Sequence, residues 1–128
     1  MSGANLNLNS DVAELTRELC DIESVSGNER EIADAIEQAL ASCGHLKVVR
    51  DGDALVASTN LGRAKRVIIA GHIDTVPVAG NLPTKLMSFE REQVIWGRGS
   101  VDMKAGVAVM LKLAATVTEP VMDVTWVF

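Results

Sequence analysis

The strongest constraint on the fold is the stretch RVIIAGHIDTVP, from Arg66 to Pro77. Four apolar residues follow Arg66 without a polar break, and Gly71 ends the run. A short, continuously apolar run bounded by glycine is typical of a strand that is covered on both faces. The sequence therefore predicts a central strand here, with His72 and Asp74 placed just after its carboxyl end.

Two amphipathic helices are predicted ahead of this strand, over residues 11–22 and 28–43. In each segment apolar residues recur every three or four positions, which places them on one face of a helix. These residues are Val12, Leu15, Leu19 and Ile22, then Ile32, Ile36, Ala39, Leu40 and Cys43. We expect Asp11 and Asn28 to act as N-caps, and Gly44 to end the second helix.

Shorter, β-branched segments predict further strands at residues 45–52, 53–60, 89–99 and 121–128. The first two are expected to form a hairpin around Asp51 and Gly52. Residues 79–85 are expected to be a loop, and an apolar helix is predicted over residues 103–117. Strand, helix and strand in this order predict a βαβ crossover. The predicted fold class is α/β, with a mixed sheet and helices on both faces.

Composition narrows the function. The 128 residues suffice for one domain, and we expect residues 1–9 to form a disordered lead to a domain over residues 10–128. The net charge of −5 argues against a nucleic-acid surface, which needs clustered Lys and Arg. The sequence has no apolar run of membrane-spanning length and no secretory signal pattern, so we expect a cytoplasmic protein with no membrane partner. Cys20 and Cys43 are expected to be free thiols.

His72 and Asp74 are candidates for a metal site. Side chains two residues apart on an extended chain point to the same side. A carboxylate there can accept a hydrogen bond from one imidazole nitrogen and leave the other nitrogen free for a metal ion. The alternative for this short pattern is a helix cap or an ordinary loop histidine.

Asp102, in the stretch WGRGSVDMKAG, is a second candidate. It also follows a predicted strand, and adjacent strands would bring it close to His72. A carboxylate can bridge two cations, which a histidine cannot. If one zinc ion were held by both side chains, a ring nitrogen and a carboxylate oxygen would lie about 3–3.5 Å apart. The alternative is an N-cap aspartate on the following helix.

Other catalytic patterns fail on spacing. Gly97 and Gly99 begin a dinucleotide-binding fingerprint, but Asp102 occupies the position of its third glycine. Lys104 does not belong to a phosphate-binding loop, and Ser100 lacks the glycine framework of a nucleophile elbow. His45 is expected to be a surface residue.

The segments IIAGHIDTVP and GRGSVDMKAGVAVML together resemble the two signature segments of the M20 family of zinc-dependent metallopeptidases and deacylases, in the same order and at a similar separation. Within the family, LCDIESVSGNE, GNLPTK and GRGSVDMKAG most resemble the actinobacterial type of succinyl-diaminopimelate desuccinylase. The resemblance implies a zinc-exopeptidase-like catalytic domain that uses two zinc ions, or cobalt in their place. It implies hydrolysis of N-succinyl-diaminopimelate to succinate and diaminopimelate in lysine and cell-wall biosynthesis.

The same resemblance implies roles for particular residues. His72 would bind one zinc ion, Asp102 would bridge both, and Asp74 would act in catalysis by orienting His72. The peptide bond between Asp102 and Met103 would be cis.

In the family, a catalytic Glu-Glu pair and further ligands follow the strand that here ends at Phe128. We therefore expect residues 10–128 to be the N-terminal, truncated part of the catalytic domain, inactive alone. We also expect a homo-oligomer that forms through the apolar strand at residues 121–128. Two alternatives stay open: another family deacylase or carboxypeptidase, such as an acetylornithine deacetylase, or a non-catalytic truncated module that self-associates.

Overall fold

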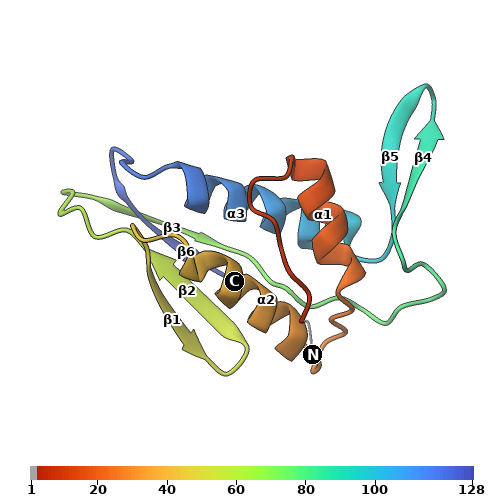
Figure 1. The fold of residues 1–128 in the computed structure, drawn as a ribbon, viewed down its shortest axis with the longest axis horizontal. Coiled ribbons are helices and arrows are strands. Elements are labelled where there is room, and N and C mark those ends of the chain that lie inside the picture. The colour runs from red at the N-terminus through yellow and green to blue at the C-terminus, as the bar shows by residue number, and fades with distance from the viewer. Residues whose placement is uncertain (1–2) are drawn as a thin grey trace.

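A four-stranded mixed sheet is the central element of the computed structural model, which describes residues 3–128 (Figure 1). Its strands, in spatial order, are β1 (Lys47–Asp51), β2 (Ala54–Ser58), β6 (Asp123–Val127) and β3 (Arg66–Ala70). β2 pairs antiparallel with β1 and with β6, whereas β3 and β6 run parallel. The predicted α/β class and mixed sheet are confirmed, and β1 and β2 form the predicted hairpin.

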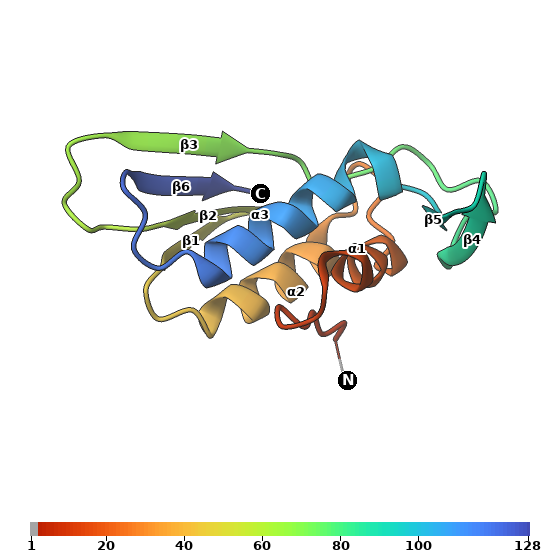
Figure 2. The same ribbon diagram turned by 90° about the horizontal axis from the view of Figure 1, so that it is seen from above.

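Three helices lie on one side of this sheet, and the first of them packs against the third beyond the carboxyl end of β3 (Figure 2). They are α1 (Val12–Asp21), α2 (Arg30–Ala41) and α3 (Ala105–Thr116). Their apolar residues share one core with the inward side chains of the sheet, including Leu55, Ala57, Val124 and Trp126. No helix of residues 3–128 covers the opposite face, where Val49 and Ile68 are 51% and 65% exposed. Within this chain the helices therefore cover one face and not the two that we expected.

β3 lies at an edge of the sheet. The apolar run had predicted a strand at its centre, and that prediction is wrong for the described residues. Among the described residues its one strand neighbour is β6. Ile68 lies on the open face, whereas Val67 and Ile69 are half-buried and pack against the core. A continuously apolar run predicts a strand that is packed on both faces, whereas β3 is packed on one face only within residues 3–128.

β6 lies in the middle of the sheet, between β2 and β3. Val124, Trp126 and Phe128 are 7%, 4% and 4% exposed, whereas Val121 and Met122, ahead of the strand, are 89% and 38% exposed. The expectation of an uncovered strand edge at residues 121–128 is therefore wrong. Hydrogen bonds to two neighbouring strands satisfy the backbone that we expected to be free.

A second sheet of two strands stands apart from the main body (Figure 1). It is the antiparallel hairpin of β4 (Lys85–Phe89) and β5 (Glu92–Trp96). The sequence analysis overlooked β4 and placed Glu90 and Arg91 inside a strand. These two residues instead form the turn, with positive φ angles of 47° and 71°. The parallel crossover therefore runs from β3 through the hairpin and α3 to β6.

The predicted capping residues account for some of the helix boundaries and not for others. Asp11 caps α1 as predicted, because its side chain accepts a hydrogen bond from the Glu14 amide at 2.9 Å. α2 begins after Glu29 and not after Asn28, and no side chain of residues 3–128 caps it. It ends at Ala41, ahead of the glycine that we expected to terminate it.

Residues 3–9 form no helix or strand, yet they pack against the body of the molecule. Leu6 is 5% exposed and belongs to the core. Lys112 Nζ donates hydrogen bonds to the carbonyl oxygens of Leu8 and Ser10, at 3.0 and 2.6 Å. The remainder of the expected lead, residues 1 and 2, lies outside the described residues.

Both cysteines are free thiols, as expected. Burial raises the pKa of the Cys20 thiol to about 11, so this sulfur is protonated at neutral pH. No helix in residues 3–128 combines the length and the apolar character needed to cross a membrane.

Candidate metal site

The loop after β3 is held by the segment that follows α1. Thr75 N donates to the Ser24 carbonyl at 2.8 Å, and Ser26 N donates to the Thr75 carbonyl at 3.0 Å. The Ser24 hydroxyl donates to the Ile73 carbonyl at 2.7 Å. These bonds continue β-type pairing beyond the strand and fix residues 72–75 in place.

The glycine that precedes His72 lies close to two methionine side chains. A Cβ atom at Gly71 would lie 2.8 Å from Met103 Cε and 3.2 Å from Met110 Sδ. The main-chain amide of His72 donates to Met103 Sδ at 3.4 Å. These contacts seat the loop after β3 against the turn that leads into α3.

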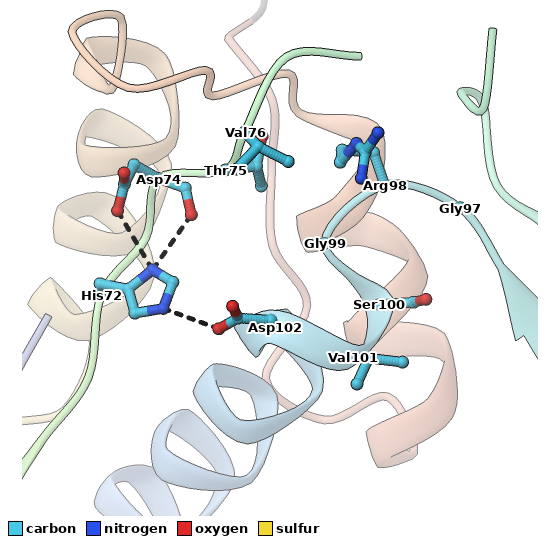
Figure 3. Close-up of a pocket in the computed structure, with 10 residues that line it drawn as sticks. All are labelled: His72, Asp74, Thr75, Val76, Gly97, Arg98, Gly99, Ser100, Val101 and Asp102. Carbon is cyan, nitrogen blue, oxygen red and sulfur yellow. Dashed lines mark hydrogen bonds and ion pairs between the residues drawn. The ribbon is translucent and has the colours of Figure 1, made fainter. Parts of the chain in front are cut away.

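That turn, Ser100–Lys104, is a kinked turn ahead of α3. Its backbone leaves the helical conformation at Asp102 (φ −125°, ψ 99°) and Met103 (φ −133°, ψ 35°). The Asp102–Met103 peptide bond is cis, as the family resemblance implies. Asp102 makes no side-chain cap on α3, because that helix begins without one. Its carboxylate points toward His72 instead (Figure 3).

The His72 ring lies between two aspartates (Figure 3). Its Nε2 atom is 2.9 Å from Asp102 Oδ1. Its Nδ1 atom is 3.1 Å from the main-chain carbonyl oxygen of Asp74 and 3.1 Å from Asp74 Oδ1. The Ser26 hydroxyl in turn donates to Asp74 Oδ2. The structure therefore brings together all three residues that the sequence analysis selected.

These contacts set the proton affinities of the site. Burial lowers the pKa of His72, but the hydrogen bonds to Asp102 and Asp74 and their charges outweigh it and leave that pKa raised. The hydrogen bond from Ser26 lowers the pKa of Asp74, and the neighbouring His72 adds to this effect. Asp74 is therefore ionised at neutral pH and accepts a hydrogen bond from the imidazole.

The donor atoms suit a zinc-type metal ion. An imidazole nitrogen and a carboxylate oxygen are both ordinary zinc ligands, and a carboxylate behind the imidazole is the usual supporting partner. Among residues 3–128, no group of three or more His, Cys, Asp or Glu side chains is placed to hold one ion. His72 and Asp102 fit two positions of a metal site, and Asp74 fits the supporting role.

A cavity of about 350 Å³ opens beside these residues. Along with His72, Asp74 and Asp102, it is lined by Thr75, Val76 and the loop from Gly97 to Val101 (Figure 3). Such a volume lies in the range of small-molecule sites. The side chain of Asp102 is 83% exposed and that of His72 is 45% exposed, so both are accessible to a ligand.

A buried lysine stands two residues after Asp102. Lys104 is 1% exposed, and its Nζ atom donates to the Ile22 carbonyl at 2.7 Å. Burial lowers its pKa. This bond ties the end of α1 to the turn that carries Asp102. The sequence analysis considered Lys104 only as a phosphate-binding residue and did not predict that it is buried. It also did not predict the contact of Ser26 with Asp74. A hydroxyl in a polar loop gives no signal of its long-range partner.

Residues 68–128 match the model of peptidase family M20/M25/M40. The matched segment is just under half of the chain, and it carries the sequence pattern of this family.

Two curated relatives and one solved structure place it further. The chain is 50% identical over 124 residues to the "Putative succinyl-diaminopimelate desuccinylase DapE" of Mycobacterium tuberculosis. It is 46% identical over 113 residues to succinyl-diaminopimelate desuccinylase of Corynebacterium glutamicum. Its fold resembles YXEP of Bacillus subtilis, a dinuclear metal-binding peptidase of the M20 family, with a TM-score of 0.62 and 15% identity.

Each match covers most of this chain and a smaller part of the other protein. The chain is covered to 96%, 87% and 94%, respectively. It spans about a third of the length of each of the three proteins (34%, 30% and 34%).

Proposed function

We propose that the protein to which this chain belongs is a metal-dependent amidohydrolase that releases succinate from N-succinyl-diaminopimelate. The observation that carries the proposal is the 2.9 Å contact between His72 Nε2 and Asp102 Oδ1, with Asp74 on the other ring nitrogen. The names of the mycobacterial and corynebacterial relatives support the substrate.

The chain's own residues prepare this chemistry. Asp74 accepts a hydrogen bond from Nδ1 of His72 and so favours the tautomer in which Nε2 is free to bind a metal ion. Ser26 fixes the carboxylate of Asp74, and the turn before α3 fixes Asp102. Zinc, or cobalt in its place, would be held by His72 and Asp102, and when bound it supplies an acidified water molecule and polarises the amide carbonyl. The name of the Bacillus subtilis protein supports a second metal ion.

We further propose that residues 10–128 are the N-terminal part of the catalytic domain and that the remaining metal ligands and the general base lie outside them. A catalytic zinc ion needs about three protein ligands. On this proposal the chain alone does not hydrolyse the substrate. The whole protein would act in the cytoplasm on a small molecule, as a homo-oligomer.

Metal binding by the chain itself tests the site. We expect Co²⁺ to bind with a visible d–d absorption band, and His72→Ala and Asp102→Ala each to weaken binding by about tenfold or more. His45→Ala is the matched control, because His45 contacts the Ala114 carbonyl, away from the site. Equal Co²⁺ affinity in all four proteins would contradict the proposed ligands.

The substrate is tested in a chimera. In it, this chain replaces the matched stretch of the Corynebacterium glutamicum relative, which restores the part that the chain does not supply. With zinc added, we expect hydrolysis of N-succinyl-diaminopimelate in preference to N-acetylornithine, and loss of hydrolysis on addition of a chelator or in His72→Ala. Preference for N-acetylornithine would favour the deacetylase alternative, and a folded chimera that hydrolyses neither compound would favour a non-catalytic module.

A further inference from the structure

Arg98 is a cation in the cavity that the proposed metal chemistry does not use. It lines the same cavity as His72 and Asp102 (Figure 3). Its Nε atom is buried without a hydrogen-bond partner, and within residues 3–128 its guanidinium makes no ion pair. Buried polar atoms are nearly always hydrogen-bonded, so a buried N–H without a partner needs an explanation.

The loop that carries Arg98 is built tightly. A Cβ atom at Gly97 would lie 2.8 Å from Thr84 Cγ2, and one at Gly99 would lie 2.9 Å from Thr75 Cγ2. Gly99 also has a positive φ of 85°, which favours glycine. The Arg98 amide donates to the Asn81 carbonyl at 2.9 Å. The main chain of Arg98 is therefore held on both sides.

The charges around the cavity make Arg98 distinctive. The other charged groups that line it are Asp74, Asp102 and, when protonated, His72. Arg98 is the one Lys or Arg among the lining residues. A guanidinium presents its N–H groups as a planar fork that matches a carboxylate in a bidentate pair. The chemistry of this position therefore favours binding of an anion. In a site for acylated amino acids, the anion that it fits best is a carboxylate.

We propose that Arg98 binds a carboxylate of the substrate beside the scissile amide. The inference rests on the proposed function and names a specificity residue for it. N-succinyl-diaminopimelate carries one carboxylate on its acyl half and one on the amino-acid carbon next to the amide. Both flank the bond to be cleaved, and either one can pair with the guanidinium of Arg98, which lines the cavity.

The test measures the binding of small carboxylates to the chain, and the NMR signal of the Arg98 Nε–H group reports the binding. Three probes are added in turn, with and without zinc: succinate, succinamate for the acyl half, and N-acetylglycine for the amino-acid half. We expect succinate to shift the Arg98 Nε–H signal in a saturable way. Of the two half-probes, the one that reproduces the shift identifies which carboxylate Arg98 binds, and a response to both still supports the anion site. No response of the Arg98 signal to any probe would overturn the inference.

Variants sharpen the result. We expect Arg98→Met to weaken succinate binding by about tenfold or more. Arg98→Lys should weaken it less, because lysine keeps the positive charge but lacks the planar guanidinium. Arg91→Met is the matched control, since Arg91 is exposed in the β4–β5 turn. Unchanged succinate affinity in Arg98→Met would also overturn the inference. These measurements involve no turnover, so their failure is distinguishable from failure of the chimera to hydrolyse the substrate.

Discussion

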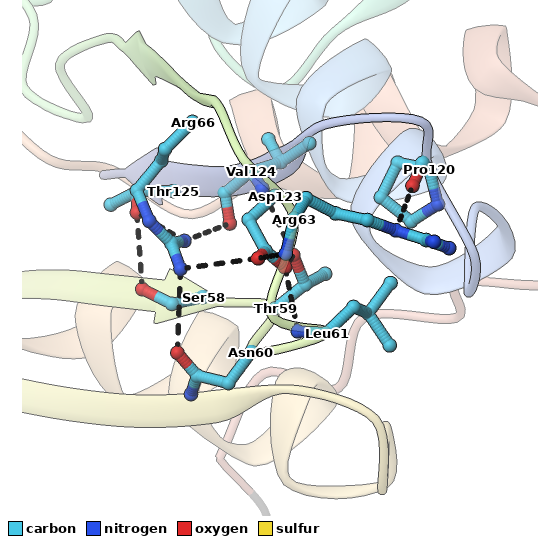
Figure 4. Close-up of polar contacts among 10 residues, drawn as sticks. All are labelled: Ser58, Thr59, Asn60, Leu61, Arg63, Arg66, Pro120, Asp123, Val124 and Thr125. Carbon is cyan, nitrogen blue, oxygen red and sulfur yellow. Dashed lines mark hydrogen bonds and ion pairs between the residues drawn. The ribbon is translucent and has the colours of Figure 1, made fainter.

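At the scale of single residues, the buried carboxylate of Asp123 joins the start of β6 to the connection between β2 and β3 (Figure 4). It is 3% exposed, and its Oδ1 atom accepts hydrogen bonds from the Thr59 hydroxyl and the Leu61 amide at 2.7 and 2.8 Å. Its Oδ2 atom accepts from the Arg63 amide at 2.9 Å. The bond from Leu61 lowers the pKa of Asp123 most; burial opposes it, but Thr59, Arg63 and Arg66 add to it and bring the pKa to about 2.

This pKa predicts a pH-dependent stability. The folded-state pKa lies below the ordinary value of 3.8, so the stabilising contribution is complete above about pH 4 and is lost as the pH falls toward 2. We expect Asp123→Asn to lower the free energy of unfolding at pH 7, and the difference from the unaltered chain to shrink between pH 4 and pH 2. Urea unfolding across this range measures it, with Asp51→Asn at the exposed end of β1 as the control. A difference that does not change with pH would contradict the assignment.

Lys104 gives a second prediction at this scale. Its side chain fills space in the core and supplies the hydrogen-bond partner of the Ile22 carbonyl. We expect Lys104→Ala to lower the free energy of unfolding by about 2–4 kcal/mol, because it leaves a cavity and an unpaired buried carbonyl. Urea unfolding at pH 7 checks this, with Lys47→Ala at an exposed position of β1 as the control. A loss within about 0.5 kcal/mol would be typical of a surface residue and would refute the packing role.

The candidate site was predictable at the level of residues because its chemistry is local. His72, Asp74 and Asp102 each follow a strand or turn signal and are residue types that bind metal ions. Ser26 and Arg98 were not predictable, since their roles depend on partners far away in the sequence or on a cavity. A hydroxyl or guanidinium in a loop looks the same whether it faces solvent or a site.

At the scale of elements, the β4–β5 turn combines two non-glycine residues with positive φ angles. A turn with positive φ at both central positions prefers Asn-Gly, and an ordinary residue in this conformation costs about 1–2 kcal/mol. The chain has Glu90 and Arg91 there. This explains why the sequence analysis overlooked β4: the residues that mark such a turn are absent, so the predicted strand over residues 89–99 ran through the turn and residues 86–88 were assigned to no element.

We expect Glu90→Asn combined with Arg91→Gly to stabilise this hairpin by about 1 kcal/mol. The hairpin stands apart from the main sheet, so the gain is expected in local opening and not in global unfolding. Hydrogen exchange of the β4 and β5 amides should slow about fivefold, a factor that corresponds to 1 kcal/mol. Amides of β1 and β2 serve as the internal control and should not change. Faster exchange in β4 and β5 would show that the native pair already suits the turn.

At the scale of the whole molecule, the helices lie on one side of the sheet and leave the other side open. The two edges of the sheet differ in character. β1 carries the exposed charges of Lys47 and Asp51, which discourage pairing with another chain, whereas β3 exposes Ile68 beside a backbone edge that no strand of residues 3–128 pairs with. The sequence showed that β3 is apolar, but the position of a strand in a sheet depends on long-range pairing that no local pattern encodes.

We therefore expect the chain to self-associate through the β3 edge and not through residues 121–128. Ile68→Lys places a charge on that edge and should weaken association by about tenfold or more, equivalent to about 1.4 kcal/mol. Val49→Lys is the matched control, because Val49 lies on the same open face but at the β1 edge. Sedimentation equilibrium measures both. A chain that is monomeric at millimolar concentration, or equal weakening by the two variants, would contradict the role of β3.

The central place of β6 has a consequence for how the chain is made. β2 and β3 are each hydrogen-bonded to β6 and not to one another. A ribosome releases residues 123–127 after every other strand of this sheet, so the nascent chain holds a β1–β2 hairpin and a lone β3 with a gap between them. Folding must then insert β6 between β2 and β3. This long-range step is slower than the pairing of strands that are adjacent in the sequence. Until that insertion, the apolar flanks of the gap are available to chaperones.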